Sequence, residues 1–275
     1  MTDPNETNAA YDPERYWDEK AKAAPDASAA VRLGDPALDR CIARSQQALI
    51  ESALRQLQTR SAVLTDMTVL DFGCGTGQWT QLLQQRFDGY AGVDISNEML
   101  ESARASFPVE RNPNIEFKQV REHGIPFEDH TFDVAFSMAV LHHNPYEEQA
   151  ILLDELCRVL RNGGWLFAFE GVGERNTDVN SHSYYRPIED WKAFYQQHDL
   201  QVVWKSNCRY ALLWYLCERM AARLRPKGSR NSRTLLGQAM RRFILRIDGW
   251  LSPTVLPWTP DRLAGRCAML LRRTK

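Results

Sequence analysis

Short apolar runs alternate with amphipathic segments from residue 67 to residue 206. The runs have the length of buried strands, and the segments between them carry apolar residues at helical spacing. Strands that alternate with helices favour a parallel, doubly wound α/β sheet. The pattern predicts strands at 67–72, 90–95, 115–119, 132–138, 164–170 and 200–206, and helices at 78–87, 97–106, 146–161 and from Ile188 onward.

Amphipathic helices are also predicted on both sides of this alternation. Residues 37–58 have an apolar face that suits packing on a sheet. Residues 211–224 and 235–251 each carry an apolar stripe, and a basic segment at 223–233 separates them. The first stripe is Leu212, Leu213, Leu216, Met220 and Leu224, and the second is Leu236, Met240, Phe243, Ile247 and Trp250. Arginines lie outside the second stripe, as in helices that bind at a membrane interface.

The net charge of −1 hides a strong division along the chain. Residues 1–204 hold 18 Lys/Arg against 32 Asp/Glu, a net of −14, whereas residues 205–275 hold 16 against 3, a net of +13. Such asymmetry predicts either an anionic partner for the C-terminal part or its folding onto the acidic part.

The six cysteines form no C-x-x-C pair or His/Cys cluster, so the sequence predicts neither a metal site nor a disulfide framework. The acidic N-terminus has no apolar segment typical of a signal peptide, and no apolar run reaches the length of a membrane span. We therefore expect a cytoplasmic protein, either free or peripheral at a membrane.

The segment most indicative of a binding site is Val69–Thr80, with the sequence VLDFGCGTGQWT. An apolar run leads into Asp71 and then three glycines at alternate positions. Glycine permits positive φ and leaves no Cβ between the turn and a ligand, and the following helix start offers free N–H groups. This pattern predicts a strand, a tight turn and a helix that hold a nucleotide-like cofactor. Cys74, inside the turn, is interpreted as a small packing residue.

Asp94 ends the next predicted strand, about twenty residues after the first glycine. A carboxylate at that position accepts hydrogen bonds from both vicinal hydroxyls of a ribose. Dinucleotide-binding dehydrogenases share this arrangement, but their glycines follow G-x-G-x-x-G and face a pyrophosphate. Here the spacing is G-x-G-x-G with an acidic residue before it, which disfavours a dehydrogenase.

Three later segments complete a pattern that resembles the class I S-adenosylmethionine-dependent methyltransferases, in the broad group called methyltransferase type 11. Residues 125–133 are similar to that family's L-P-F-x-D-x-S-F-D segment, and residues 134–143 to its fourth strand with the V-L-H-H that follows. Residues 155–166 are similar to its E-x-x-R-V-L-K-P-G-G helix and turn. With the glycine turn, the resemblance covers roughly residues 63–171.

The resemblance implies a Rossmann-like, mostly parallel seven-stranded sheet that closes with an antiparallel strand, expected at Cys267–Leu271. The expected organisation is an N-terminal segment with a cap helix at 1–61 and a cofactor-binding core at 62–208. A basic helical insertion at 209–262 follows, and 263–275 hold the final strand. We expect the insertion to act as a lid over the acceptor or as a contact with an anionic membrane surface.

The same resemblance implies S-adenosylmethionine as cofactor and suggests the residues that hold it. Gly73, Gly75 and Gly77 are expected under its methionine part, Asp71 near its amino group, and Asp94 at its ribose. Further contacts are expected at Cys74, Ile95, Met99, Glu122 and Ser137.

The adenine corner departs from the family pattern, because the usual acidic residue of G-D-A after the third strand is replaced by Val120–His123. Either Glu122 substitutes for it, or packing and backbone alone hold the adenine, with Ile95 and Met99 on its two sides. Ser137 is expected to offer its carbonyl to the methionyl amine.

A sulfonium carries its own electrophilic methyl group, so alignment of the acceptor supplies most of the rate. An oxygen acceptor also loses a proton, and a base assists that loss. The candidate bases are His142, His143, Glu170, His182 and Tyr184, which follow predicted strands at the ligand-binding edge of the sheet. Acceptor contacts are expected at Trp17, Tyr184, Tyr185 and Arg186.

The sequence thus predicts methyl transfer from S-adenosylmethionine to a small-molecule or lipid/carrier-linked acceptor at oxygen, without a metal. Two alternatives remain open at this point. One is a nucleic-acid methyltransferase that uses the basic insertion, and the other is a non-catalytic scaffold that retains the cofactor fold.

Overall fold

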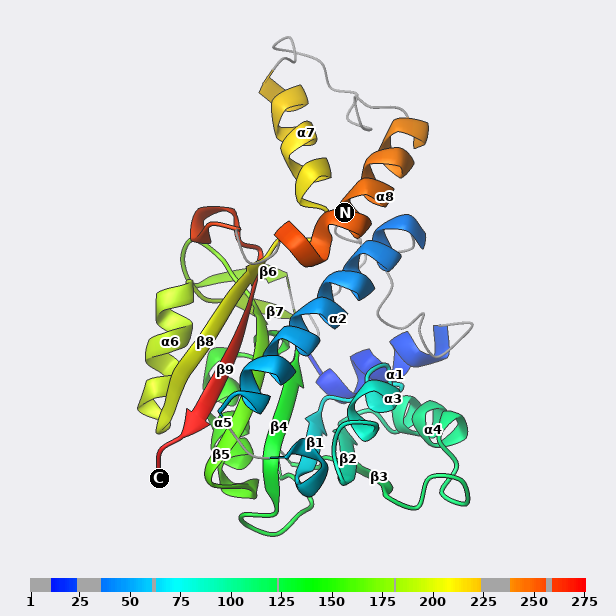
Figure 1. Cartoon of the computed structure of the whole chain (residues 1–275), viewed down its shortest axis with the longest axis vertical. Coiled ribbons are helices and arrows are strands. Elements are labelled where there is room, and N and C mark those ends of the chain that lie inside the picture. Colours follow the sequence, from blue (N-terminus) through cyan, green and yellow to red (C-terminus); the bar gives the residue numbers. More distant parts are fainter. Residues whose placement is uncertain are drawn as a thin grey trace.

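A central seven-stranded sheet organises the chain (Figure 1). The computed structural model describes residues 11–23, 36–60, 63–122, 124–180, 182–223, 238–255 and 259–275. The strand order is β3-β2-β1-β4-β5-β9-β8, with β9 antiparallel to both neighbours. The doubly wound, mostly parallel sheet and its antiparallel final strand are therefore confirmed. The strands are β1 Thr68–Phe72, β2 Gly89–Asp94, β3 Ile115–Gln119, β4 Phe132–Met138, β5 Leu160–Gly171, β8 Leu200–Cys208 and β9 Arg266–Arg273.

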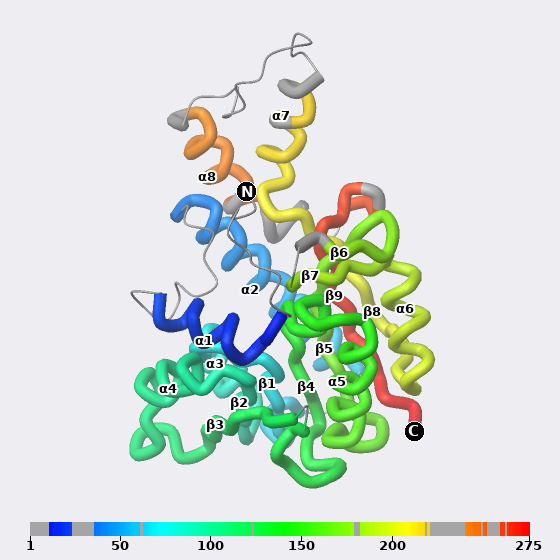
Figure 2. Tube along the Cα trace, turned by 180° about the vertical axis from the view of Figure 1, so that it is seen from behind, coloured from blue at the N-terminus to red at the C-terminus, as the bar shows by residue number. Residues whose placement is uncertain are grey.

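Helices cover both faces of this sheet (Figures 1 and 2). One core cluster joins the sheet to α5 and α6, and a second joins it to α2 and α3. Both clusters use the apolar positions that the helical spacing singles out, such as Leu49, Ala53 and Leu57. The helices are α1 Pro13–Ala23, α2 Pro36–Gln58, α3 Thr80–Gln84, α4 Asn97–Ser106, α5 Tyr146–Val159, α6 Ile188–Gln197, α7 Leu212–Arg223 and α8 Gln238–Val255.

Two predicted boundaries were wrong. The helix expected at 78–87 shrinks to α3, because turns around Gly77 continue to Trp79 and the bond from Arg86 N–H to Leu83 O tightens the last turn. The fifth strand begins at Leu160 rather than at 164, because Leu160 already pairs with Phe132 before a register shift.

The periodicity also left out two elements that border the site. A hairpin of β6 Thr177–Asn180 and β7 Ser183–Tyr185 follows β5, and a 3-10 turn at Leu141–His143 follows β4. Both are too short to give a periodic pattern.

Helices α7 and α8 follow β8 and precede β9 along the chain. They project beyond the edge of the sheet at which β8 ends (Figures 1 and 2). Asp248 of α8 fixes the pair, since its carboxylate accepts the N–H groups of Leu213 and Trp214 at the start of α7. The basic segment at 223–233 was predicted between them, but residues 224–237, with Leu224 and Leu236, lie outside the described residues.

The apolar stripe predicted on α8 is not the face that packs inward. Ile244, Leu245 and Asp248 are buried, whereas Phe243 is 60 % and Trp250 75 % exposed. The spacing of apolar residues shows that a helix has an apolar side, but it does not show whether another element packs against that side. On α8 the packing face is the neighbouring strip of residues.

Candidate active site

The glycine turn after β1 has the predicted backbone. Gly73, Gly75 and Gly77 all adopt positive φ, at +73°, +55° and +82°. The N–H groups of Gly73 and Cys74 donate to Val93 O of the next strand, which fastens the turn to β2. A Cβ on Gly73 would lie 2.3 Å from Val140 Cγ2, whereas one on Gly75 would meet only Met99 Sδ, at 3.5 Å. The turn is therefore packed behind Gly73 and has room in front of Gly75.

Asp94 joins this turn to the end of β2. Its two carboxylate oxygens accept the N–H groups of Gly75, at 2.8 Å, and Ser96, at 2.9 Å. Burial raises the pKa of Asp94 above its usual value. Each carboxylate oxygen has a second lone pair, so the group can still accept ribose hydroxyls. The buried carboxylate beside an open glycine fits S-adenosylmethionine, with Met99 buried and Ile95 half-buried next to it.

Asp71 lies deeper, against the core. It accepts the phenol of Tyr90 at 2.8 Å, and Tyr90 in turn accepts the hydroxyl of Thr80 at 2.9 Å. Burial raises the pKa of Asp71 to about 7. Its predicted role near the methionyl amine remains a prediction. Sequence reasoning missed Tyr90, although a tyrosine within an apolar strand needs a polar partner.

The adenine corner is arranged by a residue that the sequence did not single out. The Gln119 amide donates to Ile95 O at 2.9 Å and to Glu14 of α1 at 3.1 Å. Glu122 lies on an exposed turn with φ of +48°, so its contact with adenine remains a prediction. Ser137 is buried at the end of β4, beside the positive-φ residue Ala139.

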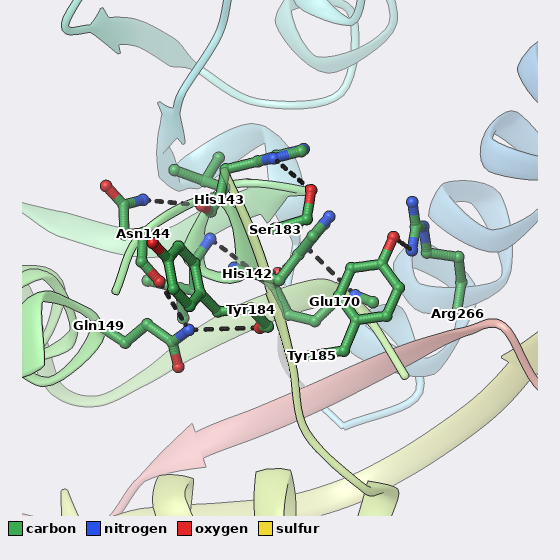
Figure 3. Close-up of polar contacts among 12 residues, drawn as sticks. His142, His143, Asn144, Gln149, Glu170, Ser183, Tyr184, Tyr185 and Arg266 are labelled. Atoms are coloured by element: carbon green, nitrogen blue, oxygen red, sulfur yellow. Dashed lines mark hydrogen bonds and ion pairs between the residues drawn. The ribbon is translucent and has the colours of Figure 1, made fainter. Parts of the chain in front are cut away.

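Three of the candidate bases, His142, His143 and Glu170, come together at the carboxyl ends of β4 and β5 (Figure 3). His142 Nδ1 lies 2.6 Å from Glu170 Oε2, and both side chains are buried. The rings of His142 and His143 are 4.3 Å apart, and the ring of His182 lies 6.0 Å from that of His143. The cluster lies at the carboxyl edge of the sheet, where parallel sheets bind ligands.

Hydrogen bonds define the protonation of the His142–Glu170 pair. The N–H of Gly171 donates to His142 Nδ1 at 3.2 Å, so this nitrogen presents a lone pair. The proton in the short contact is then assigned to Glu170, so the Glu170 O–H and the Gly171 N–H share the single lone pair of Nδ1. Burial raises the pKa of Glu170 to about 8. Burial also lowers the pKa of His142, so the neutral ring carries its hydrogen on Nε2. Nε2 is buried and has no hydrogen-bond partner among the described residues.

His143 has the opposite tautomer. Its Nδ1–H donates to His182 O at 2.8 Å, which leaves a lone pair on Nε2. Burial lowers the pKa of His143 to about 2, with the nearby His142 acting in the same direction. His143 therefore donates through Nδ1 and can accept only at Nε2, and its low basicity limits any role as a base.

Helix α1 covers both halves of the site. Trp17, a predicted acceptor contact, stands edge-on to the His143 ring at 5.3 Å, and Tyr16 OH lies 3.0 Å from His182 Nε2. On the cofactor side, Asp18 accepts the hydroxyl of Ser96, the N-cap of α4. The helix thus bridges the start of α4, next to Asp94, and the histidine cluster.

The other predicted acceptor contacts separate into two groups. The Tyr185 ring lies 5.3 Å from that of His142, and its hydroxyl accepts from Arg266 at 2.6 Å (Figure 3). Tyr184 packs against Tyr146 at the rim of the cluster. Arg186 instead bonds to Gln149 and lies over the rings of Tyr146 and Phe194, which suits fixing the hairpin to α5 and α6.

A hollow of about 450 Å³ lies at the opposite, amino end of β1, β2 and β3, between Thr68, Gly89 and Ile115. The glycine turn and the histidine cluster are remote from it, so we assign it no part in the chemistry. Among the described residues no group of three His, Cys, Asp or Glu side chains is placed to hold a metal ion.

Comparison with known proteins agrees with this geometry. Residues 69–164 match the family model described as a methyltransferase domain. The chain carries a class I S-adenosylmethionine-dependent methyltransferase domain. The matched segment runs from β1 into β5, so this domain includes the glycine turn, Asp94 and the histidine pair.

Similar proteins include other methyltransferases. The chain is 37% identical over 114 residues to a demethylmenaquinone methyltransferase of Lactococcus lactis, covering 40% of this chain and 44% of that one. It is 27% identical over 105 residues to a ubiquinone biosynthesis O-methyltransferase of Nitrosomonas europaea, covering 38% and 43%. The matches thus span less than half the length of these relatives.

One solved methyltransferase structure has a fold similar to that of this chain over nearly its whole length. It is the geranyl diphosphate C-methyltransferase of Streptomyces coelicolor, with a TM-score of 0.60 at 14% identity, covering 98% of this chain and 99% of that one. At this identity the likeness shows the fold alone.

Proposed function

We propose that the protein transfers a methyl group from S-adenosylmethionine to an oxygen of a small, lipid-soluble or lipid-linked acceptor. The observation that carries the proposal is the joint position of two features at one sheet edge. The turn with Asp94 lies at the ends of β1 and β2, and the histidine cluster with Tyr185 lies at the ends of β4 and β5. The similarity to a demethylmenaquinone methyltransferase and to a ubiquinone biosynthesis O-methyltransferase supports an acceptor of this kind.

The residues of this chain would position and shield the reaction. Bound S-adenosylmethionine supplies an electrophilic methyl group on sulfur. Asp94 and the N–H groups around Gly75 would orient the donor, while Tyr185 and Trp17 would hold the acceptor beside it. Helix α1 would exclude water, since it bridges both halves.

The direct test is transfer of a labelled methyl group. Purified protein is incubated with trideuteromethyl S-adenosylmethionine and an extract of the source cells, and products are followed by mass spectrometry. We expect a labelled product in the lipid-soluble fraction, methylated at oxygen, and formation of S-adenosylhomocysteine in equal amount. Absence of labelled product with folded, donor-binding protein would contradict the proposed activity.

We further propose that α7 and α8 bring the protein to an anionic membrane surface. Apolar side chains on both helices are exposed, with Met220 at 64 %, Phe243 at 60 % and Trp250 at 75 %. Arg219, Arg242 and Arg246 are exposed on the same two helices. Aromatic and aliphatic side chains bordered by arginines suit the headgroup region of a bilayer. None of the described helices has the length and apolar character that a bilayer-crossing segment needs.

Removing two of these side chains should weaken vesicle binding strongly. The double variant Phe243→Ser, Trp250→Ser is expected to lower partition onto phosphatidylglycerol vesicles by about 100-fold, since each aromatic contributes roughly 1.5 kcal/mol on burial. Sedimentation with vesicles measures the partition. A matched control, Val109→Ser with Ile151→Ser, removes exposed apolar residues elsewhere and should bind as the parent does. Equal loss in both double variants would contradict a specific membrane face.

A further inference from the structure

Arg266 is a cation without an anionic partner at the edge of the proposed acceptor site. It begins β9 and pairs in register with Gly171 at the end of β5, so it shares the sheet edge with Glu170 and His142. Its guanidinium donates to Tyr185 OH and to Gly265 O, both of which are neutral. In the described part of the chain no carboxylate lies within ion-pair distance of Arg266.

The nearest acidic group does not compensate this charge. Arg266 favours the ionised form of Glu170, but burial outweighs this attraction and raises the pKa of Glu170 to about 8, so Glu170 keeps the proton of its short contact with His142. At neutral pH the Glu170–His142 pair is therefore uncharged, and Arg266 leaves the cluster with a net positive charge. Burial opposes the charge of Arg266, but the surrounding Tyr185, Tyr210 and Glu170 outweigh burial and raise its pKa, so the guanidinium stays fully charged and can bind an anion.

A second group in the same place also lacks a partner. His142 carries its hydrogen on Nε2, which is buried and bonds to none of the described residues. Both groups adjoin the Tyr185 ring, which lies 5.0 Å from the Arg266 guanidinium carbon and 5.3 Å from the His142 ring (Figure 3). A buried N–H donor and a cation around one aromatic ring together require an acceptor atom with negative charge.

We propose that the methyl acceptor is an acid that binds in its ionised form beside Tyr185, with its anionic group held by Arg266 and by His142 Nε2–H. This inference rests on the proposed methyl transfer and names the class of acceptor for it. Helix α1 lies over the cluster, so the acceptor enters when α1 shifts.

The balance of the reaction explains why this arrangement needs no base. The anionic oxygen forms a bond to the methyl carbon as the bond from that carbon to sulfur breaks. The bonding pair of the broken bond stays on sulfur, so the sulfonium becomes a neutral thioether and the acceptor loses one negative charge. No proton is transferred, which is consistent with the weak basicity of His143 and with a His142 that donates.

The test separates acceptors by charge. The source-cell extract is divided on a strong anion exchanger at pH 8, and the retained and unretained fractions are each incubated with full-length protein and labelled S-adenosylmethionine. We expect label to enter the retained fraction, in a product that elutes with one negative charge fewer than its acceptor. Label only in the unretained fraction would overturn the acidic acceptor while leaving methyl transfer intact, and label in neither would contradict the proposed function itself.

Variants test the assigned side chain. Arg266→Gln is expected to lower kcat/KM for the retained fraction by about 100-fold, chiefly through KM, with unchanged affinity for S-adenosylhomocysteine. Arg266→Lys, which keeps the charge, should restore part of the loss. Arg272→Gln removes an exposed arginine from the same strand and should act as the parent does. Equal activity of folded Arg266→Gln and Arg272→Gln would overturn the assignment, and the fractionation stays decisive if Arg266→Gln does not fold.

Discussion

Replacing Asp94 by asparagine is expected to weaken the binding of S-adenosylhomocysteine by about 100-fold or more. Both carboxylate oxygens already accept backbone N–H groups, from Gly75 and Ser96. An amide keeps one acceptor oxygen and turns an NH₂ group toward the other N–H, which misplaces the turn. It also removes the charge that strengthens hydrogen bonds from ribose hydroxyls, and two such bonds contribute roughly 3 kcal/mol together. Titration calorimetry at neutral pH measures the affinity.

A nearby acid provides the matched control for this loss. Glu101→Gln removes a carboxylate from the exposed side of α4, where Glu101 accepts a hydrogen bond from the Asn97 side chain. Its affinity for S-adenosylhomocysteine should match that of the parent. If folded Asp94→Asn binds the product as tightly as Glu101→Gln does, the assignment of the ribose to Asp94 is wrong.

Alanine at Gly73 and at Gly75 should damage the protein in two different ways. Gly73→Ala places a methyl group 2.3 Å from Val140 Cγ2 at φ of +73°, so it should destabilise the fold by about 3 kcal/mol through overpacking and backbone strain. Gly75→Ala meets only Met99 Sδ, at 3.5 Å, and should fold with a cost of about 1 kcal/mol for its φ. Its methyl group would nevertheless occupy the open face and abolish cofactor binding.

Urea unfolding and calorimetry distinguish the two effects. The double variant Gly73→Ala, Val140→Ala should recover the overpacking part of the lost stability, because the smaller side chain makes room for the new methyl group. A Gly75→Ala protein that binds S-adenosylhomocysteine normally would show that the cofactor does not approach this face of the turn.

Local signals in the sequence were sufficient for the sheet and for the backbone of the glycine turn. Apolar runs of strand length, glycines at positions that need positive φ, and an acidic residue at the end of β2 are each readable from neighbouring residues. The antiparallel β9 came from the family resemblance, because an isolated apolar run does not reveal its direction.

Packing alone decided the chemistry of the acceptor side. His142 and Glu170 are 28 residues apart, and Tyr16 and His182 are 166 apart, so no local pattern joins them. Whether His142 donates or accepts depends on the Gly171 N–H that points at its Nδ1, and the missing counter-charge of Arg266 depends on which groups surround it.

The sequence by itself determined a doubly wound sheet, a glycine turn and the position of a carboxylate at the end of β2. Each of these follows from the pattern of a few neighbouring residues. Only the tertiary structure decided which histidine presents a hydrogen, where Arg266 lies, and that Phe243 and Trp250 of α8 face outward. These features are set by burial and by contacts between distant segments, and periodicity along one helix or strand carries no information about them.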